Sequence, residues 1–414
     1  MATIRPFKAL RPIPALAPLV AALPYDVMSS DEAREMVKGN PYSFLHVDKA
    51  EIDLDPSVNP YDPAVYDKAR ENLLKMISDG VLTRDASDCF YIYRQTMSGR
   101  NQTGIVAVAS IDDYLKSVIK KHEHTRSDKE IDRISHVDRC NANTGPIFLT
   151  YRSQADLNSI IDERTSSYLP VYDFVSDDGI GHKVWIIDDT EIIRKITDSF
   201  AAIESLYIAD GHHRCASAVK VGLMRRSADP GFTGSEDFNF FLSVLISDTQ
   251  IYIMDYNRYV GDLNGLSTEA FLQETGRVFK ISRIPHSVQY KPEAEHTFGM
   301  YLDGAWYKLM LKDGLLDGAD ALSMLDVTIL QKFMLTPILG IKDPRTDKRI
   351  DFIGGIRGPG ELRKRVDSSG GAAFTLFPTS IEDLMDIADS GEVMPPKSTW
   401  FEPKLRSGLF IHEL

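Results

Sequence analysis

Short apolar segments typical of strands alternate with helical patterns along most of the chain, and this alternation constrains its fold most strongly. A capping pair, Ser29 with Glu32, predicts a helix over residues 31–38, and a second helix is predicted over about 63–77. Residues 89–94 and 104–109 predict two strands joined by a polar turn, hence a β-hairpin. Further strands are predicted at 147–151, 184–187, 206–209, 240–246 and 251–256, and beyond them a helix near 268–275, a hairpin at 301–311 and a helix at 325–334. We therefore expect an α+β protein with mixed sheets and flanking helices.

The organisation of the chain indicates more than one domain. A length of 414 residues suggests two or three domains, and the sequence contains no internal repeat. We place a boundary near residue 260. Residues 1–260 then form the region that carries the chemistry, and residues 261–414 form a C-terminal α+β region packed against it.

Charge and cysteine usage exclude several classes of function. Lys and Arg number 47 against 60 Asp and Glu, which gives a net charge of −13, and such a chain is not expected to bind nucleic acid in general. Three scattered cysteines with no CxxC pair cannot form a closed disulfide framework, so a reducing, cytoplasmic setting is expected. The apolar stretch near the N-terminus is broken by prolines, and we expect no membrane span.

The segment 206–219 carries the sharpest local signal for chemistry. An apolar strand runs into Asp210 and Gly211, and His212, His213 and Arg214 follow at the start of a helical pattern. Backbone N–H groups at a helix start favour a phosphate, and Arg can hold phosphate oxygens with two hydrogen bonds. A surface turn whose histidines are solvated or cap the helix explains the same spacing equally well. Metal binding by the adjacent histidines is less favoured, because no HExxH spacing surrounds them.

A second signal lies in residues 121–136. If this segment is helical, five basic residues fall on one stripe: His122, Arg126, Lys129, Arg133 and His136. The acidic residues between them favour a solvated, salt-bridged helix instead. Glu123 stands directly before the stripe, where a carboxylate near phosphate-binding groups could take a proton from a hydroxyl.

Other candidate sites are weaker. Asp210, at the end of the predicted strand, could hold Mg²⁺ through its carboxylate, or it could simply cap the following helix. Residues 141–146 are predicted to form a loop that either lines a pocket or only makes a turn. The glycine-rich residues 352–360 lack the GxGxxG spacing and are interpreted as a structural loop. The sequence also lacks the P-loop, the protein-kinase HRD motif and the GxSxG elbow.

Several motifs together resemble the DUF1015 family over nearly the whole sequence. They are residues 24–27 (PYDV), 40–47 (NPYSFLHV), 122–125 (HEHT), 210–214 (DGHHR), 254–258 (MDYNR) and 394–401 (MPPKSTWF). The resemblance implies a core similar to that of the ParB/sulfiredoxin superfamily, and some members are similar to free L-serine kinases. Residues 210–214 resemble the DGHHR of archaeal free serine kinases and the nucleotide-binding GxxR of ParB and sulfiredoxin proteins. Since His212 stands where sulfiredoxin has its catalytic cysteine, reductase activity is not expected.

The resemblance implies a kinase that transfers a phosphoryl group from ATP or ADP to the hydroxyl of free L-serine, with Mg²⁺ bridging the phosphates. Glu123, Asp210 and His213 are the candidate catalytic residues, with Asp210 also the candidate metal ligand. The candidate phosphate-binding residues are His122, Arg126, Gly211, His212, His213 and Arg214. The alternatives are a kinase for another small hydroxylated metabolite and a non-catalytic regulatory protein that binds a nucleotide or an amino acid. The sequence predicts no oligomeric state.

Overall fold

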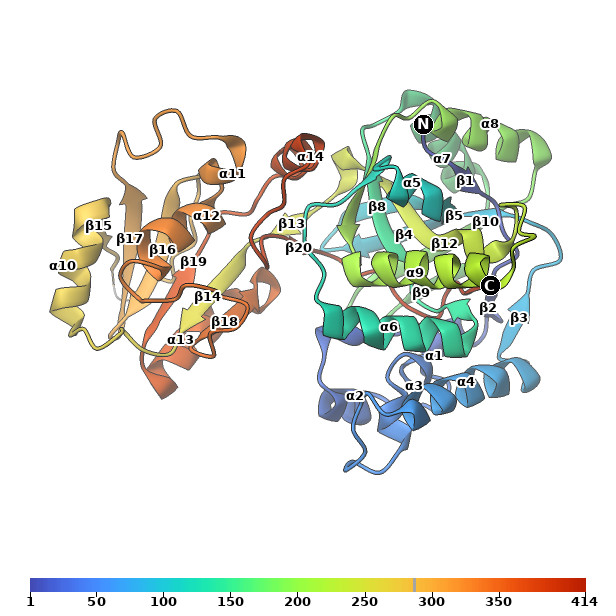
Figure 1. Ribbon diagram of the computed structural model, residues 1–414, viewed down its shortest axis with the longest axis horizontal. Coiled ribbons are helices and arrows are strands. Elements are labelled where there is room, and N and C mark those ends of the chain that lie inside the picture. Colours follow the sequence, from blue (N-terminus) through green and yellow to red (C-terminus); the bar gives the residue numbers. More distant parts are fainter. Residues whose placement is uncertain (286–287) are drawn as a thin grey trace. The chain divides into compact units, whose positions relative to one another are not determined.

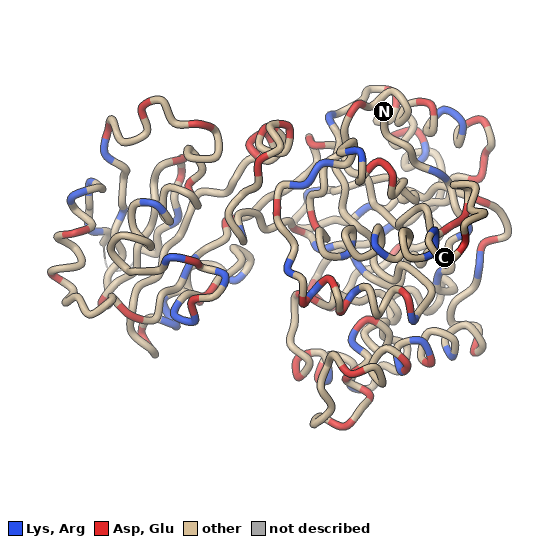
Figure 2. Tube along the Cα trace, viewed as in Figure 1, with Lys and Arg blue, Asp and Glu red and all other residues tan. Residues whose placement is uncertain are grey.

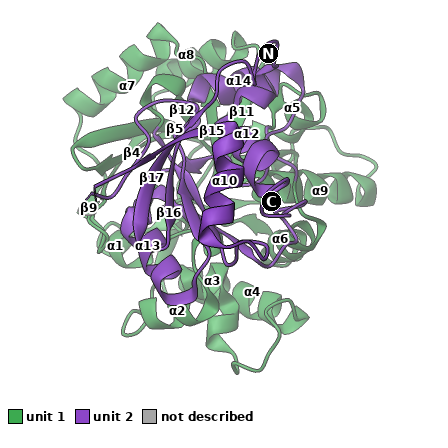
Figure 3. Cartoon of the chain, turned by 90° about the vertical axis from the view of Figure 1, so that its left-hand side faces the viewer, with its two compact units in different colours: residues 1–121, 125–251, 403–414 green, residues 122–124, 252–402 purple. Residues whose placement is uncertain are grey.

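The chain forms two compact units in the computed structural model, which describes residues 1–285 and 288–414 (Figures 1 and 3). Unit 1 comprises Met1–Lys121, Thr125–Ile251 and Pro403–Leu414, and unit 2 comprises His122–His124 and Tyr252–Glu402. This division differs from a single boundary at residue 260, because the end of the chain returns to unit 1. The return is made by backbone pairing between distant segments, which a local sequence pattern does not reveal.

One large mixed sheet forms the centre of unit 1. Its strands are β1 (Ile4–Arg5), β4 (Phe90–Met97), β5 (Arg100–Ser110), β6 (Ile119–Lys120), β8 (Ile147–Tyr151), β9 (Tyr172–Val175), β10 (Gly181–Ile187), β11 (Leu206–Asp210) and β12 (Phe240–Ser247). Their order is β6-β11-β8-β12-β5-β4-β10-β9, with β1 beside β5. The pairs β6–β11 and β8–β12 are parallel and the others antiparallel. Two small sheets pair β2 (Leu10–Pro12) with β3 (Leu82–Arg84), and β7 (Ala142–Asn143) with β21 (His412–Glu413).

Unit 1 also contains α-helices, some of which pack on this sheet. They are α1 (Ala17–Val20), α2 (Ser30–Met36), α3 (Leu45–Asp48), α4 (Pro63–Ser78), α5 (Ile111–Leu115), α6 (Ser127–Cys140), α7 (Ala155–Ser167), α8 (Thr190–Ala201) and α9 (His212–Ala228). Figure 1 shows α6 and α9 side by side, and the hydroxyl of Ser217 in α9 donates to the carbonyl of Glu130 in α6. Apolar side chains of α7, α8 and α9 bury against the strands in one core.

Unit 2 contains a smaller, antiparallel sheet. Its strands, in the order β15-β17-β16-β19-β14-β18, are β14 (Tyr256–Val260), β15 (Phe279–Arg283), β16 (Thr297–Leu302), β17 (Ala305–Leu311), β18 (Ile350–Gly354) and β19 (Ala372–Thr375). A separate pair is β13 (Ile253–Met254) with β20 (Trp400–Phe401). The helices are α10 (Thr268–Val278), α11 (Ala321–Met324), α12 (Asp326–Leu330), α13 (Gly358–Ser369) and α14 (Ile381–Ser390). Leu362 and Val366 of α13 pack on the sheet.

The structure confirms the predicted α+β class with mixed sheets and flanking helices. The capping box of Ser29 and Glu32 is formed at the start of α2, and α4 covers the second predicted helix. The β4–β5 hairpin closes on Ser98 and Gly99, both with positive φ, which suits a tight two-residue turn. Acidic and basic residues are interspersed along each unit, including α6 (Figure 2). Among the described residues, no helix is both long and apolar enough to cross a lipid bilayer.

Three predictions of local structure are wrong. Residues 251–256 do not form one strand, because the chain leaves the β13 pair at Asp255 before β14 enters the larger sheet. Residues 352–360 are not simply a loop, because they include the end of β18 and the start of α13. Residues 121–126 are not helical, since α6 begins only at Ser127. Here the backbone N–H of Arg126 donates to the ring of His213 at 3.0 Å, a contact made by the tertiary fold.

A buried carboxyl group in unit 2 leads to a prediction about pH. Asp326 begins α12 and is 8% exposed. One of its oxygens accepts from the backbone N–H of His296 at 2.8 Å, and the other has no hydrogen-bond partner among the described residues. Burial raises the pKa of Asp326 to about 7. The folded protein therefore holds a proton that the unfolded chain has released, over the range between about pH 4 and pH 7.

We expect the free energy of unfolding to fall as the pH rises through this window, by up to about 4 kcal/mol, and to level off above pH 7. In Asp326→Asn this decline disappears, because the amide does not ionise. Urea unfolding followed by intrinsic fluorescence at pH 5 and pH 8 measures the difference, with the exposed Asp317→Asn as a matched control. Equal pH dependence in the wild type and Asp326→Asn would contradict the expectation.

Candidate functional site

The turn between β11 and α9 forms the centre of the candidate site in unit 1. The strand β11 is buried up to Ala209, and its register against β8 shifts between Ile208 and Asp210, which is a β-bulge at the end of the strand. Gly211 follows with φ +91° in the left-handed region, and α9 begins at His212. A Cβ on Gly211 would lie 3.0 Å from Nε and 3.2 Å from Cζ of Arg214. Glycine is therefore required here both by the backbone and by the guanidinium packed against it.

Arg214 connects this turn to the start of β8. Its Nη1 donates to the carbonyl of Pro146 at 2.6 Å, whereas its buried Nε has no hydrogen-bond partner among the described residues. Burial alone would lower the pKa of Arg214, but the nearby carboxylates of Asp26 and Asp210 raise it overall. The side chain therefore stays cationic and keeps hydrogen-bond donors that the fold does not satisfy.

Asp210 is an ionised carboxylate held by two donors. Its Oδ1 accepts from the backbone N–H of Gly211 at 2.9 Å, and its Oδ2 accepts from Nζ of Lys404 at 3.0 Å. Burial would raise the pKa of Asp210, but Lys404 and Arg214 hold it well below its usual range. Lys404 was not found from the sequence, because it lies 194 residues away in the segment that returns to unit 1. No local pattern signals that contact.

The structure places His213 beside Arg126, both in unit 1. Nε2 of His213 accepts the backbone N–H of Arg126, so a neutral ring carries its proton on Nδ1. The guanidinium of Arg126 is 60% exposed and pairs with Asp128 at 2.9 Å. Arg126 thus reaches the turn through its backbone and not through its charge. His212, the first residue of α9, is 7% exposed.

The other two candidates belong to unit 2. His122 and Glu123 are grouped with it, and the carbonyl of His122 accepts the backbone N–H of Met394 at 2.8 Å. The predicted basic stripe is therefore not a single helical face. Of its members only Lys129, Arg133 and His136 lie on α6, and Arg133 and His136 are buried in unit 1 instead of solvated.

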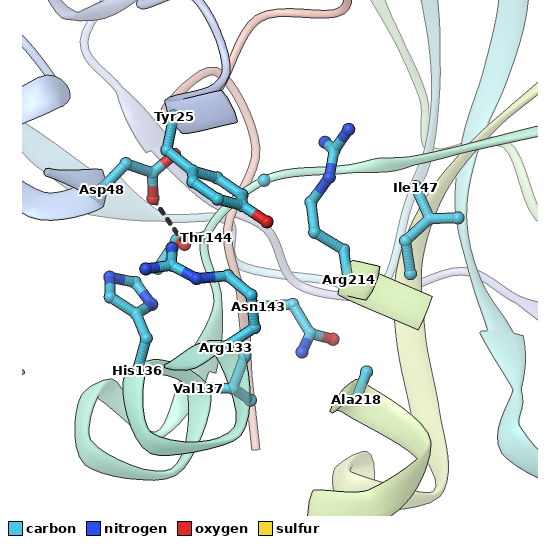
Figure 4. Close-up of a pocket in the computed structure, with 11 residues that line it drawn as sticks. Tyr25, Asp48, Arg133, His136, Val137, Asn143, Thr144, Ile147, Arg214 and Ala218 are labelled. Carbon is cyan, nitrogen blue, oxygen red and sulfur yellow. Dashed lines mark hydrogen bonds between the residues drawn. The ribbon is translucent and has the colours of Figure 1, made fainter. Parts of the chain in front are cut away.

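A small cavity of about 20 Å³ lies next to Arg214 in unit 1 (Figure 4). The residues that surround it include Tyr25, Asp48, Arg133, His136, Asn143, Thr144, Gly145 and Arg214. Of the two alternatives for residues 141–146, a pocket lining or only a turn, the structure favours the first, because Asn143, Thr144 and Gly145 border this cavity. Tyr25, Asp48 and Arg133 were not predicted for this site. Tyr25 lies in the PYDV motif of residues 24–27, which indicated the family resemblance but did not indicate a role at this site.

Buried charges in the cavity wall are arranged around Arg133. Its guanidinium carbon lies 4.0 Å from the centre of the Tyr25 ring, and its Nε donates to Asp132 at 2.9 Å. Thr144 donates its hydroxyl to Oδ1 of Asp48 at 2.7 Å. Burial and the charge of Arg133 lower the pKa of His136, whose Nε2 lies 3.0 Å from the carbonyl of Val47. His136 is thus neutral, and the positive charges of the cavity wall are those of its arginines.

Comparison with solved structures gives matches of low sequence identity. "SbnI with C-terminal truncation from Staphylococcus aureus" is 11% identical, with 74% of this chain and 86% of that chain covered and a TM-score of 0.39. A mutant of free serine kinase in complex with AMP is 12% identical, with 74% and 92% covered and a TM-score of 0.37. A further mutant of free serine kinase, in complex with ADP, is 13% identical, with 74% and 92% covered and a TM-score of 0.36.

A search of curated proteins finds no match for this sequence. The family model described as "Protein of unknown function (DUF1015)" matches residues 4–328. That range covers well over half of the chain and includes the β11–α9 turn and every residue named around the cavity. The chain therefore belongs to the DUF1015 family.

Proposed function

We propose that this protein is a small-molecule kinase that transfers a phosphoryl group from ATP or ADP to the hydroxyl of free L-serine, which gives O-phospho-L-serine. The observation that carries the proposal is the β11–α9 turn, where the guanidinium of Arg214 packs on Gly211 at the start of a long helix. The resemblance of residues 210–214 to the motif of free serine kinases supports the choice of acceptor. The alternative is a regulatory protein that binds a nucleotide or an amino acid without turnover.

Four features of the turn suit phosphate. The first backbone N–H groups of α9 point out of the helix, and its macrodipole favours an anion at this end. Arg214 adds a cation with unsatisfied donors, and the first turn contains no acidic residue to compete. In the proposed mechanism, Gly211–Arg214 hold the phosphates, and His213 donates through Nδ1.

Mg²⁺ fits the chemistry of Asp210. Mg²⁺ sites in phosphoryl transfer use one or two carboxylates together with substrate phosphates. Asp210 is ionised, 28% exposed and adjacent to the helix start, so its carboxylate would hold the ion. The ion would neutralise charge on the transferred phosphoryl group. Because Lys404 and the N–H of Gly211 already occupy part of this carboxylate, a cation there has to use the remaining lone pairs.

The proton of the serine hydroxyl needs a base, and Asp210 is poorly suited to that role. Its pKa is held well below the usual range, so its carboxylate has little affinity for a proton. Nε2 of His213 already accepts a backbone N–H. We therefore propose Glu123 as the base and Asp210 as the metal ligand.

Glu123→Gln is expected to lower turnover by roughly 100- to 10,000-fold, since the amide cannot take the proton. Nucleotide affinity should change little, because the phosphate-binding groups are untouched. Steady-state kinetics and calorimetric nucleotide binding measure the two effects. Glu269→Gln, an exposed first-turn substitution in α10, serves as the control. Normal turnover by Glu123→Gln would show that Glu123 is not the base.

The function itself is tested by incubating the full-length protein with Mg²⁺, ATP or ADP, and a panel of free amino acids that includes L-serine and L-threonine. Mass spectrometry identifies the product. O-Phosphoserine would establish the kinase and its donor. Nucleotide binding without any phosphorylated product would favour the regulatory protein.

The proposed location is the cytoplasm. Cys89, Cys140 and Cys215 are buried free thiols in the structure. Burial raises the pKa of each thiol above its ordinary value, so none is activated as a nucleophile. Buried thiols without disulfides are typical of proteins in reducing compartments.

A further inference from the structure

The cavity beside Arg214 is lined by hydrogen-bond donors that the fold leaves unused. Arg133 is 8% exposed, and its Nε is its only atom that donates to another described residue. Its terminal nitrogens, Nη1 and Nη2, therefore make no hydrogen bond within the described part of the chain. The hydroxyl of Tyr25 likewise makes none there. These donors border the cavity and remain available to a ligand or to water.

The cavity wall carries charges of both signs. Arg133 and Arg214 supply two cations, and Asp48 supplies one carboxylate that is 4% exposed. Oδ1 of Asp48 accepts from Thr144, while Oδ2 accepts no hydrogen bond from any described residue. A methyl group placed on Gly145 would lie 3.7 Å from Nη1 of Arg214 and 3.8 Å from Oδ2 of Asp48. Oδ2 of Asp48 and the guanidinium of Arg214 therefore both border the space beside Gly145.

This arrangement is complementary to a zwitterion. In the view of Figure 4, Asp48 and Arg133 lie on one side of the Tyr25 ring and Arg214 lies on the other, with the Tyr25 hydroxyl between the two arginines. A volume of about 20 Å³ holds about one water molecule, which a ligand would displace. A phosphate dianion is bulkier and would be repelled by Asp48.

We propose that Arg133 binds the carboxylate of the amino-acid acceptor and that Asp48 binds its ammonium group. The inference rests on the proposed kinase function, because it assigns the acceptor to a site that shares Arg214 with the phosphate turn. An acceptor held there lies next to the proposed phosphate site. This pair of contacts also explains why the substrate is an amino acid. An alcohol that lacks the carboxylate leaves Arg133 without its partner, and one that lacks the ammonium group leaves Asp48 without its partner.

The test compares acceptors that differ by one charged group. L-Serine carries both groups, ethanolamine lacks the carboxylate, and 3-hydroxypropionate lacks the ammonium. In Arg133→Met, KM for L-serine should rise roughly 10- to 100-fold, while kcat/KM for ethanolamine and KM for the nucleotide stay within about threefold. Asp48→Asn should raise KM for L-serine by a similar factor. It should not raise KM for 3-hydroxypropionate, which has no ammonium group.

Matched variants separate recognition from folding. Arg133→Lys keeps the charge and should restore part of the affinity. Arg139→Met removes an exposed arginine from the same helix and should change nothing. Arg133→Met could fail to fold because Asp132 loses its partner. In that case the double variant Asp132→Asn with Arg133→Met, which removes both buried charges, is used in place of the single variant.

Direct binding distinguishes this inference from the proposed function. Calorimetry with L-serine and L-alanine measures affinity without turnover. Product formation by the wild type together with an unchanged KM for L-serine in Arg133→Met would overturn the inference and leave the kinase intact. Binding of both amino acids that is lost in Arg133→Met, without any product from the wild type, would support the site and overturn the kinase. Failure of the wild type to bind either amino acid would overturn the inference.

Discussion

Replacing Arg214 by alanine is expected to lower kcat/KM for phosphoryl transfer to L-serine by roughly 100- to 1000-fold while the protein stays folded. The guanidinium packs on Gly211 at the proposed phosphate position and keeps an unsatisfied Nε. Within the described part of the chain it donates one hydrogen bond, from Nη1 to the carbonyl of Pro146. The loss should therefore appear in turnover and nucleotide affinity and much less in stability.

The matched control for Arg214→Ala is Arg225→Ala. Arg225 lies in the last turn of the same helix and donates to Oδ1 of Asp138 at 2.9 Å. Its removal should leave kcat/KM unchanged. Steady-state kinetics with both variants, together with thermal unfolding, make the measurement. Activity of Arg214→Ala equal to that of Arg225→Ala would exclude the phosphate role of Arg214.

The second large effect is expected for Gly211→Ala. An alanine at φ +91° is strained by about 1–2 kcal/mol, and its Cβ would lie only 3.0 Å from Nε of Arg214. The guanidinium therefore has to leave its position. We expect a fall in kcat/KM of roughly 100-fold or more, as for loss of the cation itself, together with a modest loss of stability.

Gly99→Ala separates the two causes. Gly99 has φ +78° in the β4–β5 turn, and no atom lies within 4 Å of a Cβ placed there. Its alanine variant should lose a similar amount of stability through backbone strain and keep full activity. Chemical unfolding and kinetics on the two variants give the comparison. Full activity in Gly211→Ala would show that the position of Arg214 does not matter for turnover.

Local sequence patterns were sufficient for much of the secondary structure. The capping box at Ser29, the strand at β8 and the transition from strand to glycine to helix at residues 206–219 all follow from short-range rules of periodicity, capping and glycine conformation. These rules involve neighbours within a few residues. They hold whenever the tertiary environment does not compete with them, and at these positions it does not.

Competition from the tertiary structure explains the errors. The pattern of residues 121–136 is compatible with one long helix, but His213 accepts the N–H of Arg126 and α6 starts at Ser127. Likewise, residues 251–256 are apolar enough for one strand, yet two different sheets divide them at Asp255. In both places a partner from elsewhere in the chain decides where the element begins or ends.

By itself, the sequence determined the α+β class and the position of the strand, glycine and helix that carry Asp210, Gly211 and Arg214. Only the tertiary structure decided which side chains surround them. Lys404 reaches Asp210 because the end of the chain returns to unit 1, and the cavity at Arg133 exists because α6 buries that side chain against Tyr25. Periodicity records which face of an element is apolar, but not which distant residue meets it, since that depends on how all the elements pack.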